Sequence, residues 1–163
     1  MKRNVVIRPI CGAQELETCA RMMAESEPWI TLQRDYAASL RNLSSHEKEI
    51  HVAAQGDEIL GFVVLNLHCG FVGYIQSICV APQWRNHSIG RKLVAFAEQR
   101  VFKDYPNLFI CVSSFNSGAL RLYRTLGYEV VGELKNYIVD GHSEILLRKT
   151  IGSLTKFRKT KKS

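Results

Sequence analysis

Two features are missing from this 163-residue sequence, and each excludes a class of protein. None of its five cysteines belongs to a Cys-x-x-Cys pair, and an odd number of scattered cysteines fits neither a disulfide framework nor a zinc site. We therefore expect a reducing compartment, the cytoplasm, and no metal. No apolar run is long enough to cross a bilayer, and the basic N-terminus lacks the apolar core and cleavage site of a secretory signal. We accordingly expect no membrane partner.

Acidic residues are absent from the C-terminal segment, where basic residues gather. From position 148 onward the sequence has seven Lys or Arg and no acid, which equals the whole net charge of +7. We expect residues 151–163 to form a flexible, solvated basic tail without a nucleic-acid partner. The alternative, binding of nucleic acid through this tail, predicts an affinity that depends strongly on salt.

The hydrophobic pattern predicts a single mixed α/β domain over residues 1–150. Apolar residues at three- and four-residue spacing predict helices over residues 13–26, 31–43, 89–102 and 116–126. Strands are predicted over residues 5–10, 50–54, 59–67, 74–80, 108–112, 128–139 and 142–149. Asp140-Gly141 predicts a tight turn between the last two strands. The order β-α-α-β-β-β-α-β-α-β-β indicates a mixed sheet with helices on its faces.

A polar turn between a strand and a helix is the first candidate binding site. The strand stops at Pro82, the polar residues Arg-Asn-His-Ser occupy positions 85–88, and helical spacing begins at Ile89. The first-turn amides of a helix have no acceptor within it, and the helix dipole favours negative charge there. The turn therefore predicts a phosphate-binding site, although an ordinary strand-to-helix loop can have this composition.

A second strand and helix carry two further candidates. Asn116 lies where a strand is predicted to end, so its side chain either binds a ligand amide or caps the following helix. Tyr123 follows two helical turns later; a buried tyrosine of this kind is usually a core residue. Two strands that each end at a polar turn before a helix create a crevice at their carboxyl ends.

The two stretches together resemble the GCN5-related N-acetyltransferases (GNAT), and the resemblance covers residues 5–149. The family's phosphate motif, Gln/Arg-x-x-Gly-x-Gly/Ala, is matched by residues 85–90, except that Ser88 replaces the first glycine. The second motif is matched by Asn116, Ala119, Leu122-Tyr123 and Gly127-Tyr128. The resemblance implies a central mixed sheet of about seven strands, splayed between the fourth and fifth and flanked by four helices.

The resemblance also implies acetyl-CoA as co-substrate and direct attack of a primary amine on its thioester. The residues implied to bind acetyl-CoA are Ile78, Cys79, Val80, Arg85, Asn86, His87, Ser88, Ile89, Gly90, Arg91, Asn116 and Tyr123. Backbone donors of residues 78–80 would polarise the thioester carbonyl. Tyr123 would protonate the departing thiolate, and Asn116 would touch the pantetheine or the reacting centre. A positive φ at Ser88 would strain that residue.

An amine that is protonated at neutral pH needs a base before it can attack. Some members of the family carry a carboxylate on the strand before the second motif, but residues 108–114 contain no acid. The candidates elsewhere are Glu25, Glu27, His68 and a water held by Gln76, Ser77 or Ser113. For acceptor binding the candidates are Glu27, Trp29, Gln76 and Tyr137, because an acid near aromatic rings suits a cation. Alternatively, Trp29 packs on the sheet and Tyr137 covers the last hairpin.

We expect the acceptor to be a small-molecule amine. The closing hairpin and size also resemble the ribosomal-protein N-terminal alanine acetyltransferases, which act on a peptide N-terminus, but the strand acid often found there is missing. A further alternative is a non-catalytic CoA-binding sensor. Members of the family are often dimers, so a homodimer is compatible with the resemblance.

Overall fold

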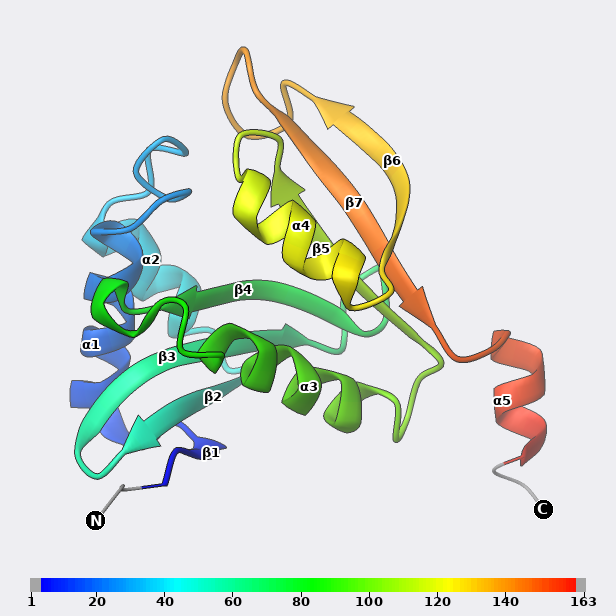
Figure 1. The fold of residues 1–163 in the computed structure, drawn as a ribbon, viewed down its shortest axis with the longest axis horizontal. Helices are drawn as coiled ribbons and strands as arrows, with labels where there is room; N and C mark the ends of the chain where they lie inside the picture. Colours follow the sequence, from blue (N-terminus) through cyan, green and yellow to red (C-terminus); the bar gives the residue numbers. More distant parts are fainter. Residues whose placement is uncertain (1–3, 161–163) are drawn as a thin grey trace. The chain divides into compact units, whose positions relative to one another are not determined.

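The computed structural model describes residues 4–160. Seven strands form one mixed sheet in the order β1-β2-β3-β4-β5-β7-β6, and the described chain also holds five α-helices and one short 3-10 helix, η1 (Figure 1). The elements are β1 Val6–Pro9, α1 Gly12–Ala24, α2 Tyr36–Leu43, β2 Lys48–Gln55, β3 Glu58–Asn66, β4 Tyr74–Val80, η1 Pro82–Trp84, α3 Ile89–Val101, β5 Asn107–Ser113, α4 Ser117–Thr125, β6 Glu129–Lys135, β7 Ser143–Thr150 and α5 Leu154–Thr160. The predicted mixed sheet and element order are confirmed. No helix within residues 4–160 has the length and apolar character needed to span a membrane.

The chain divides into two compact units. Unit 1 takes the chain up to Leu65 together with Gln76–Phe96, and unit 2 takes Asn66–Ile75 and the chain from Ala97 onward. Strand β4 and helix α3 therefore contribute residues to both units. The single domain over residues 1–150 stays a prediction.

Unit 1 is built on a core between α1, α2 and the strands β2, β3 and β4. Helices α1 and α2 pack on each other, and Figure 1 shows both near the left-hand end of these strands. Alternate residues of each strand face the helices because side chains alternate across a sheet. The buried cluster contains Cys19, Ala20, Met23, Trp29, Leu43, Ile50, Val52, Ala54, Phe62, Val64 and Cys79. This packing holds β4, which leads into the polar turn.

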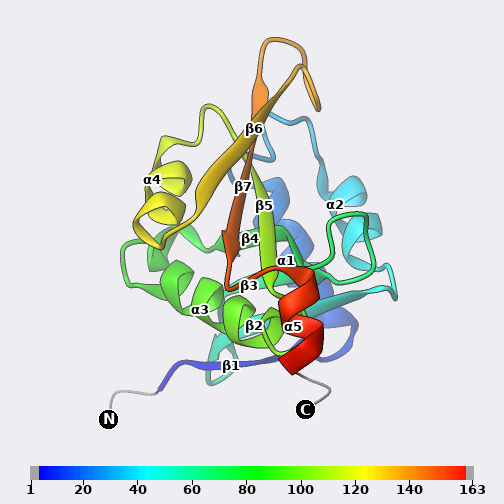
Figure 2. The same cartoon turned by 90° about the vertical axis from the view of Figure 1, so that its right-hand side faces the viewer.

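Unit 2 is an antiparallel arrangement of β5, β7 and β6, to which β4 adds its first residues in parallel. Strand β5 runs along β7 from Asn107 opposite Thr150 to Ser113 opposite Glu144. Strand β4 pairs with β5 through Tyr74 opposite Phe109 and Ile75 opposite Ile110. Figure 2 shows α4 along one side of these strands.

The second helix is shorter than the sequence predicts. The pattern predicts residues 31–43, but α2 begins only at Tyr36. Asp35 caps it, because its Oδ1 accepts a hydrogen bond from the amide of Ala38 at 2.8 Å. Gln33, two residues earlier, has a φ of 55°, which a right-handed helix excludes.

The closing hairpin has a longer connection than the predicted two-residue turn. Strand β6 ends at Lys135 rather than at residue 139. The Asn136 amide donates to the carbonyl of His142 at 3.0 Å, and the Asn136 side-chain oxygen accepts from the amide of Gly141 at 2.9 Å. Asn136 itself has a φ of 51°. The side chain of Asn136 therefore organises this loop, which a dipeptide turn signal could not reveal.

The C-terminal segment adds a fifth helix to the four that the sequence predicts. Helix α5 spans Leu154–Thr160, within the segment expected to be a flexible tail. Lys161 and Lys162, which belong to the predicted basic tail, lie outside the described residues.

Candidate functional site

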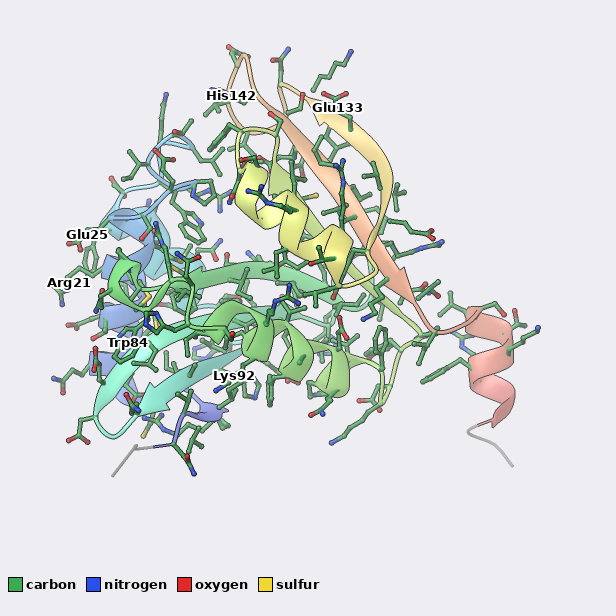
Figure 3. All side chains as sticks on the ribbon, in the orientation of Figure 1. Arg21, Glu25, Trp84, Lys92, Glu133 and His142 are labelled. Atoms are coloured by element: carbon green, nitrogen blue, oxygen red, sulfur yellow. The ribbon has the colours of Figure 1, made fainter. Side chains whose placement is uncertain are left out.

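The polar turn of unit 1 starts from a fixed point at the end of β4. The amide of Ala81 donates to the carbonyl of Leu60 at 2.9 Å, which keeps the chain on β3 just after β4 ends. The 3-10 helix η1 follows, and the Trp84 indole donates to the Glu58 carboxylate at 2.7 Å. Figure 3 shows Trp84 at this corner. The hydrogen bonds of Ala81 and Trp84 thus hold the chain in place just before the turn between η1 and α3.

The backbone of the turn has the geometry of an anion site. Asn86 and Ser88 have φ angles of 63° and 61°, both in the left-handed region. The carbonyl of Ser88 accepts from the amide of Lys92 at 3.0 Å, so Ser88 is the N-cap of α3. The amides of Ile89 and Gly90 therefore lack acceptors inside the helix, and left-handed residues next to a helix turn aim successive N–H groups at one point.

The charge of the turn has one sign. Arg85, Arg91 and Lys92 are basic, and the sequence has no acid between Pro82 and Ala97. Lys92 lies on the first turns of α3 in Figure 3. The guanidinium Nε of Arg85 makes a long hydrogen bond of 3.4 Å to the carbonyl of Val80. Converging amides and basic side chains at a helix N-terminus can bind a phosphate group.

Ser88 is strained by this geometry. A φ of 61° is uncommon for any residue with a Cβ and costs about 1–2 kcal/mol, whereas glycine adopts it freely. Strain at Ser88 was expected only for a positive φ, and the angle is positive. The serine therefore keeps the turn of the family motif at an energetic cost.

At the end of β4, residues 78–80, one side chain is buried and two are half-buried. Cys79 is buried in the core of unit 1, and burial raises the pKa of its thiol to about 12. Its Sγ lies 3.8 Å from the carbonyl of Met22. Cys79 is therefore a core residue, and its side chain is not available to a ligand. The main chain of residues 78–80 and the half-buried side chains of Ile78 and Val80 remain as candidates for contact with a ligand.

Asn116 in unit 2 caps helix α4. Its Oδ1 accepts from the amide of Ala119 at 3.1 Å, and its own amide donates to the carbonyl of Ser113 at 2.8 Å. Of the two roles that the sequence left open, the structure shows the cap. The side-chain NH₂ group of Asn116 is not used by the cap and is the part that a ligand could meet.

Tyr123 in unit 2 has a buried hydroxyl. Its side chain is 1% exposed, and no hydrogen-bond partner of the hydroxyl is found among the described residues. Its ring meets that of Tyr128 edge to face, with centroids 5.1 Å apart. Burial raises the pKa of Tyr123, so the phenol stays protonated at neutral pH. Such a hydroxyl can donate a proton to a strong base that forms next to it.

Glu144 is a residue that the sequence analysis missed. It is 4% exposed, and the hydroxyl of Ser113 donates to its Oε1 at 2.6 Å across the β5–β7 pair. The bases expected from the sequence were Glu25, Glu27, His68 or a held water, none of them on β7. Glu144 stands next to the apolar run Ile145–Leu147, but only the strand register shows that it lies opposite the end of β5.

The other predicted residues belong to both units. Within unit 1, Glu25 and Glu27 are exposed, Ser77 is buried, and Trp29 is 7% exposed and belongs to the core, so it packs on the sheet. The Gln76 side chain donates to Asn42 at 3.3 Å, and its own oxygen is buried without a partner among the described residues. Within unit 2, His68 is exposed and Tyr137 is 64% exposed in the β6–β7 connection. No group of three or more His, Cys, Asp or Glu within residues 4–160 is arranged to hold a metal ion.

The mixed sheet and the polar turn before α3 are the arrangement expected of an N-acetyltransferase, and comparison with known proteins shows that class and identifies the family. The model described as "Acetyltransferase (GNAT) family" matches residues 13–128, so the chain belongs to this family. An N-alpha-acetyltransferase of Sulfurisphaera tokodaii is 28% identical over 126 residues, which cover 69% of this chain and 75% of that protein.

Two solved structures illustrate the shared fold. An aminoglycoside 6'-N-acetyltransferase complexed with coenzyme A has a TM-score of 0.74 at 16% identity, over 91% of this chain and 98% of that one. The ribosomal-protein-S18-alanine N-acetyltransferase of Escherichia coli has a TM-score of 0.71 at 17% identity, over 92% and 96%. At these identities the likeness concerns the fold.

Proposed function

We propose that this chain transfers the acetyl group of acetyl-CoA to a primary amine by direct attack of the amine on the thioester. The observation that carries the proposal is the turn at residues 85–91, where left-handed Asn86 and Ser88 precede the N-terminus of α3 and no acid is near in sequence. The pyrophosphate of acetyl-CoA would lie on the amides of this turn, with the Arg85 guanidinium adding charge-assisted hydrogen bonds.

The roles of the remaining residues follow from their chemistry. Backbone N–H groups at the end of β4, residues 78–80, would hold the pantetheine and polarise the thioester carbonyl. Tyr123 would protonate the thiolate of CoA as it leaves, because a buried phenol keeps its proton until a strong base appears. Asn116 would contact the pantetheine through the NH₂ group that its helix cap leaves unused.

Two classes of acceptor are supported by different observations. The curated relative of Sulfurisphaera tokodaii is an N-alpha-acetyltransferase, which favours the α-amino group of a peptide. The small-molecule amine expected from the sequence is the second candidate, since the fold is shared with an aminoglycoside acetyltransferase. Among the proposed acceptor residues, exposed Glu27 and Tyr137 suit a cation better than Trp29, whose ring packs in the core.

An acceptor screen tests the function. The protein is incubated with acetyl-CoA and a panel of peptides with free N-termini, polyamines, aminoglycosides and amino acids, and the release of CoA thiol is followed. We expect release that requires one class of acceptor, together with a matching acetylated product found by mass spectrometry. Tight binding of acetyl-CoA without release on any acceptor would instead support the CoA-binding sensor.

A further inference from the structure

We propose that Glu144 is the general base that takes a proton from the acceptor ammonium. This inference rests on the proposed function, and it assigns a role that no acid on β5 can fill, because residues 108–114 contain none. Glu144 is the charged residue among the buried polar side chains of the described chain. Burying a carboxylate costs free energy, so a buried glutamate at this position indicates a function that offsets the cost.

The position of Glu144 is set by strand register. It is the second residue of β7 and lies opposite Ser113, the last residue of β5. The 2.6 Å hydrogen bond from the Ser113 hydroxyl fixes one carboxylate oxygen. The Ser113 carbonyl in turn accepts the amide of Asn116, the N-cap of the helix that carries Tyr123. A short run of chain thus links the carboxylate to the proposed acid.

The carboxylate and the proposed acid lie on opposite faces of the β5–β7 pair. Lys149 donates to Glu98 of α3 at 2.8 Å and lies over the ring of Tyr128, which itself contacts Tyr123 of α4. The face of Lys149 is therefore the helix face. Residues at odd and even positions of a strand point to opposite sides, so Glu144 points to the other face.

The groups around Glu144 on that face are polar and ionisable. Its charge contributes to raising the pKa of Cys111 on β5 and of Tyr74 on β4, although burial is the larger cause for both. Arg148 lies four residues further along β7 on the same face. The His142 ring, just before β7, packs on Phe115 at 4.8 Å between centroids. Cys111, Tyr74 and Arg148 are thus the ionisable neighbours of the carboxylate on this face.

The proton balance of the step is complete. The ammonium of the acceptor gives one proton to Glu144, and the free amine attacks the carbonyl carbon of acetyl-CoA. The carbon–sulfur bond then breaks, and the sulfur takes the proton of the Tyr123 phenol. The second proton of the attacking nitrogen restores that phenol, and Glu144 releases its proton to water. The products are the amide, CoA thiol and one proton.

The pH dependence of Glu144→Gln tests the role, with Glu133→Gln as control. Glu133 is an exposed acid on the neighbouring strand β6 (Figure 3). For the acceptor found in the screen, kcat/KM is measured from about pH 6 to about pH 10. We expect Glu144→Gln to lower kcat/KM by about 10²-fold at neutral pH. The loss should shrink as the pH rises through the pKa of the acceptor amine, while Glu133→Gln follows the parent.

Two outcomes for Glu144→Gln overturn the inference. A variant within about threefold of the parent at neutral pH would remove Glu144 from the reaction. A loss that is equal at every pH would mean a structural role for the Ser113–Glu144 hydrogen bond. If Glu144→Gln does not fold, Ser113→Ala and Glu144→Asp replace it in the test. Both variants keep a carboxylate, so both should keep the shape of the parent's pH profile, and a changed profile would contradict the inference. Absence of thiol release by the unaltered chain is a different result, which contradicts the proposed function itself.

Discussion

Replacing Ser88 by glycine should stabilise the protein relative to the same replacement at Asn86. Both residues have φ angles near 60° in the same turn, 61° and 63°. An L-residue in the left-handed region costs about 1–2 kcal/mol, but asparagine visits this region routinely because its side chain bonds locally. Glycine at either position adds a similar entropy to the unfolded chain, about 0.4–1 kcal/mol. The unfolded-state contribution therefore cancels when the two variants are compared.

The expected difference between Ser88→Gly and Asn86→Gly is about 1 kcal/mol in the free energy of unfolding, in favour of Ser88→Gly. Urea denaturation of the parent and both variants measures it, and a thermal scan should show a gap of about 2–4 °C for a chain of this size. Ser88→Val gives a further check, because a β-branched residue in this region is a genuine outlier and should destabilise. If Ser88→Gly were as destabilising as Asn86→Gly, the backbone strain at Ser88 would be refuted.

Three further predictions concern the turn, the acid and the core. Arg85→Ala should raise the acetyl-CoA dissociation constant about tenfold or more, because a charge-assisted hydrogen bond to phosphate is lost. Calorimetry measures this constant, and Lys103→Ala, at an exposed lysine, is the control. Equal dissociation constants for the two variants would contradict the role of Arg85. Tyr123→Phe should lower kcat by about 10²-fold without changing acetyl-CoA binding. Tyr128→Phe is the control, because it removes a neighbouring buried hydroxyl and should keep the parent's kcat. An unaltered kcat for Tyr123→Phe would exclude Tyr123 as the acid. Gly61→Ala should lower the free energy of unfolding by about 1–3 kcal/mol, because the new Cβ would lie 2.6 Å from the Cys79 carbonyl oxygen. Gly132→Ala is the control, because a Cβ there has nothing within 4 Å. Equal unfolding midpoints for the two variants would show that β3 and β4 can move apart.

Elements with a strong periodic pattern could be predicted from the sequence. Strand β4 has the predicted bounds, Tyr74–Val80, because alternating burial and a following proline define it. Gly127 ends α4 with a φ of 87°, as a left-handed cap should. The predicted start of α2 was wrong, because the local hydrogen bond of the Asp35 cap outweighed the apolar spacing before it.

The candidate site likewise has parts that could be predicted from the sequence and parts that could not. The polar turn between β4 and α3 could be predicted because its residues are consecutive, so sequence order is also spatial order. Glu144 could not, because its neighbour Ser113 is 31 positions away and only the β5–β7 register brings the two together. Trp29 was ambiguous for a related reason: an aromatic residue in a loop pattern gives no sign of whether it faces solvent or the core that it joins here.

Acceptor-dependent release of CoA thiol from acetyl-CoA is the decisive measurement for the proposed acetyl transfer. We expect release with at least one primary amine, an acetylated product in equal amount, and release slowed about 10²-fold in Tyr123→Phe. Binding of acetyl-CoA with no thiol release on any peptide or small amine would contradict it.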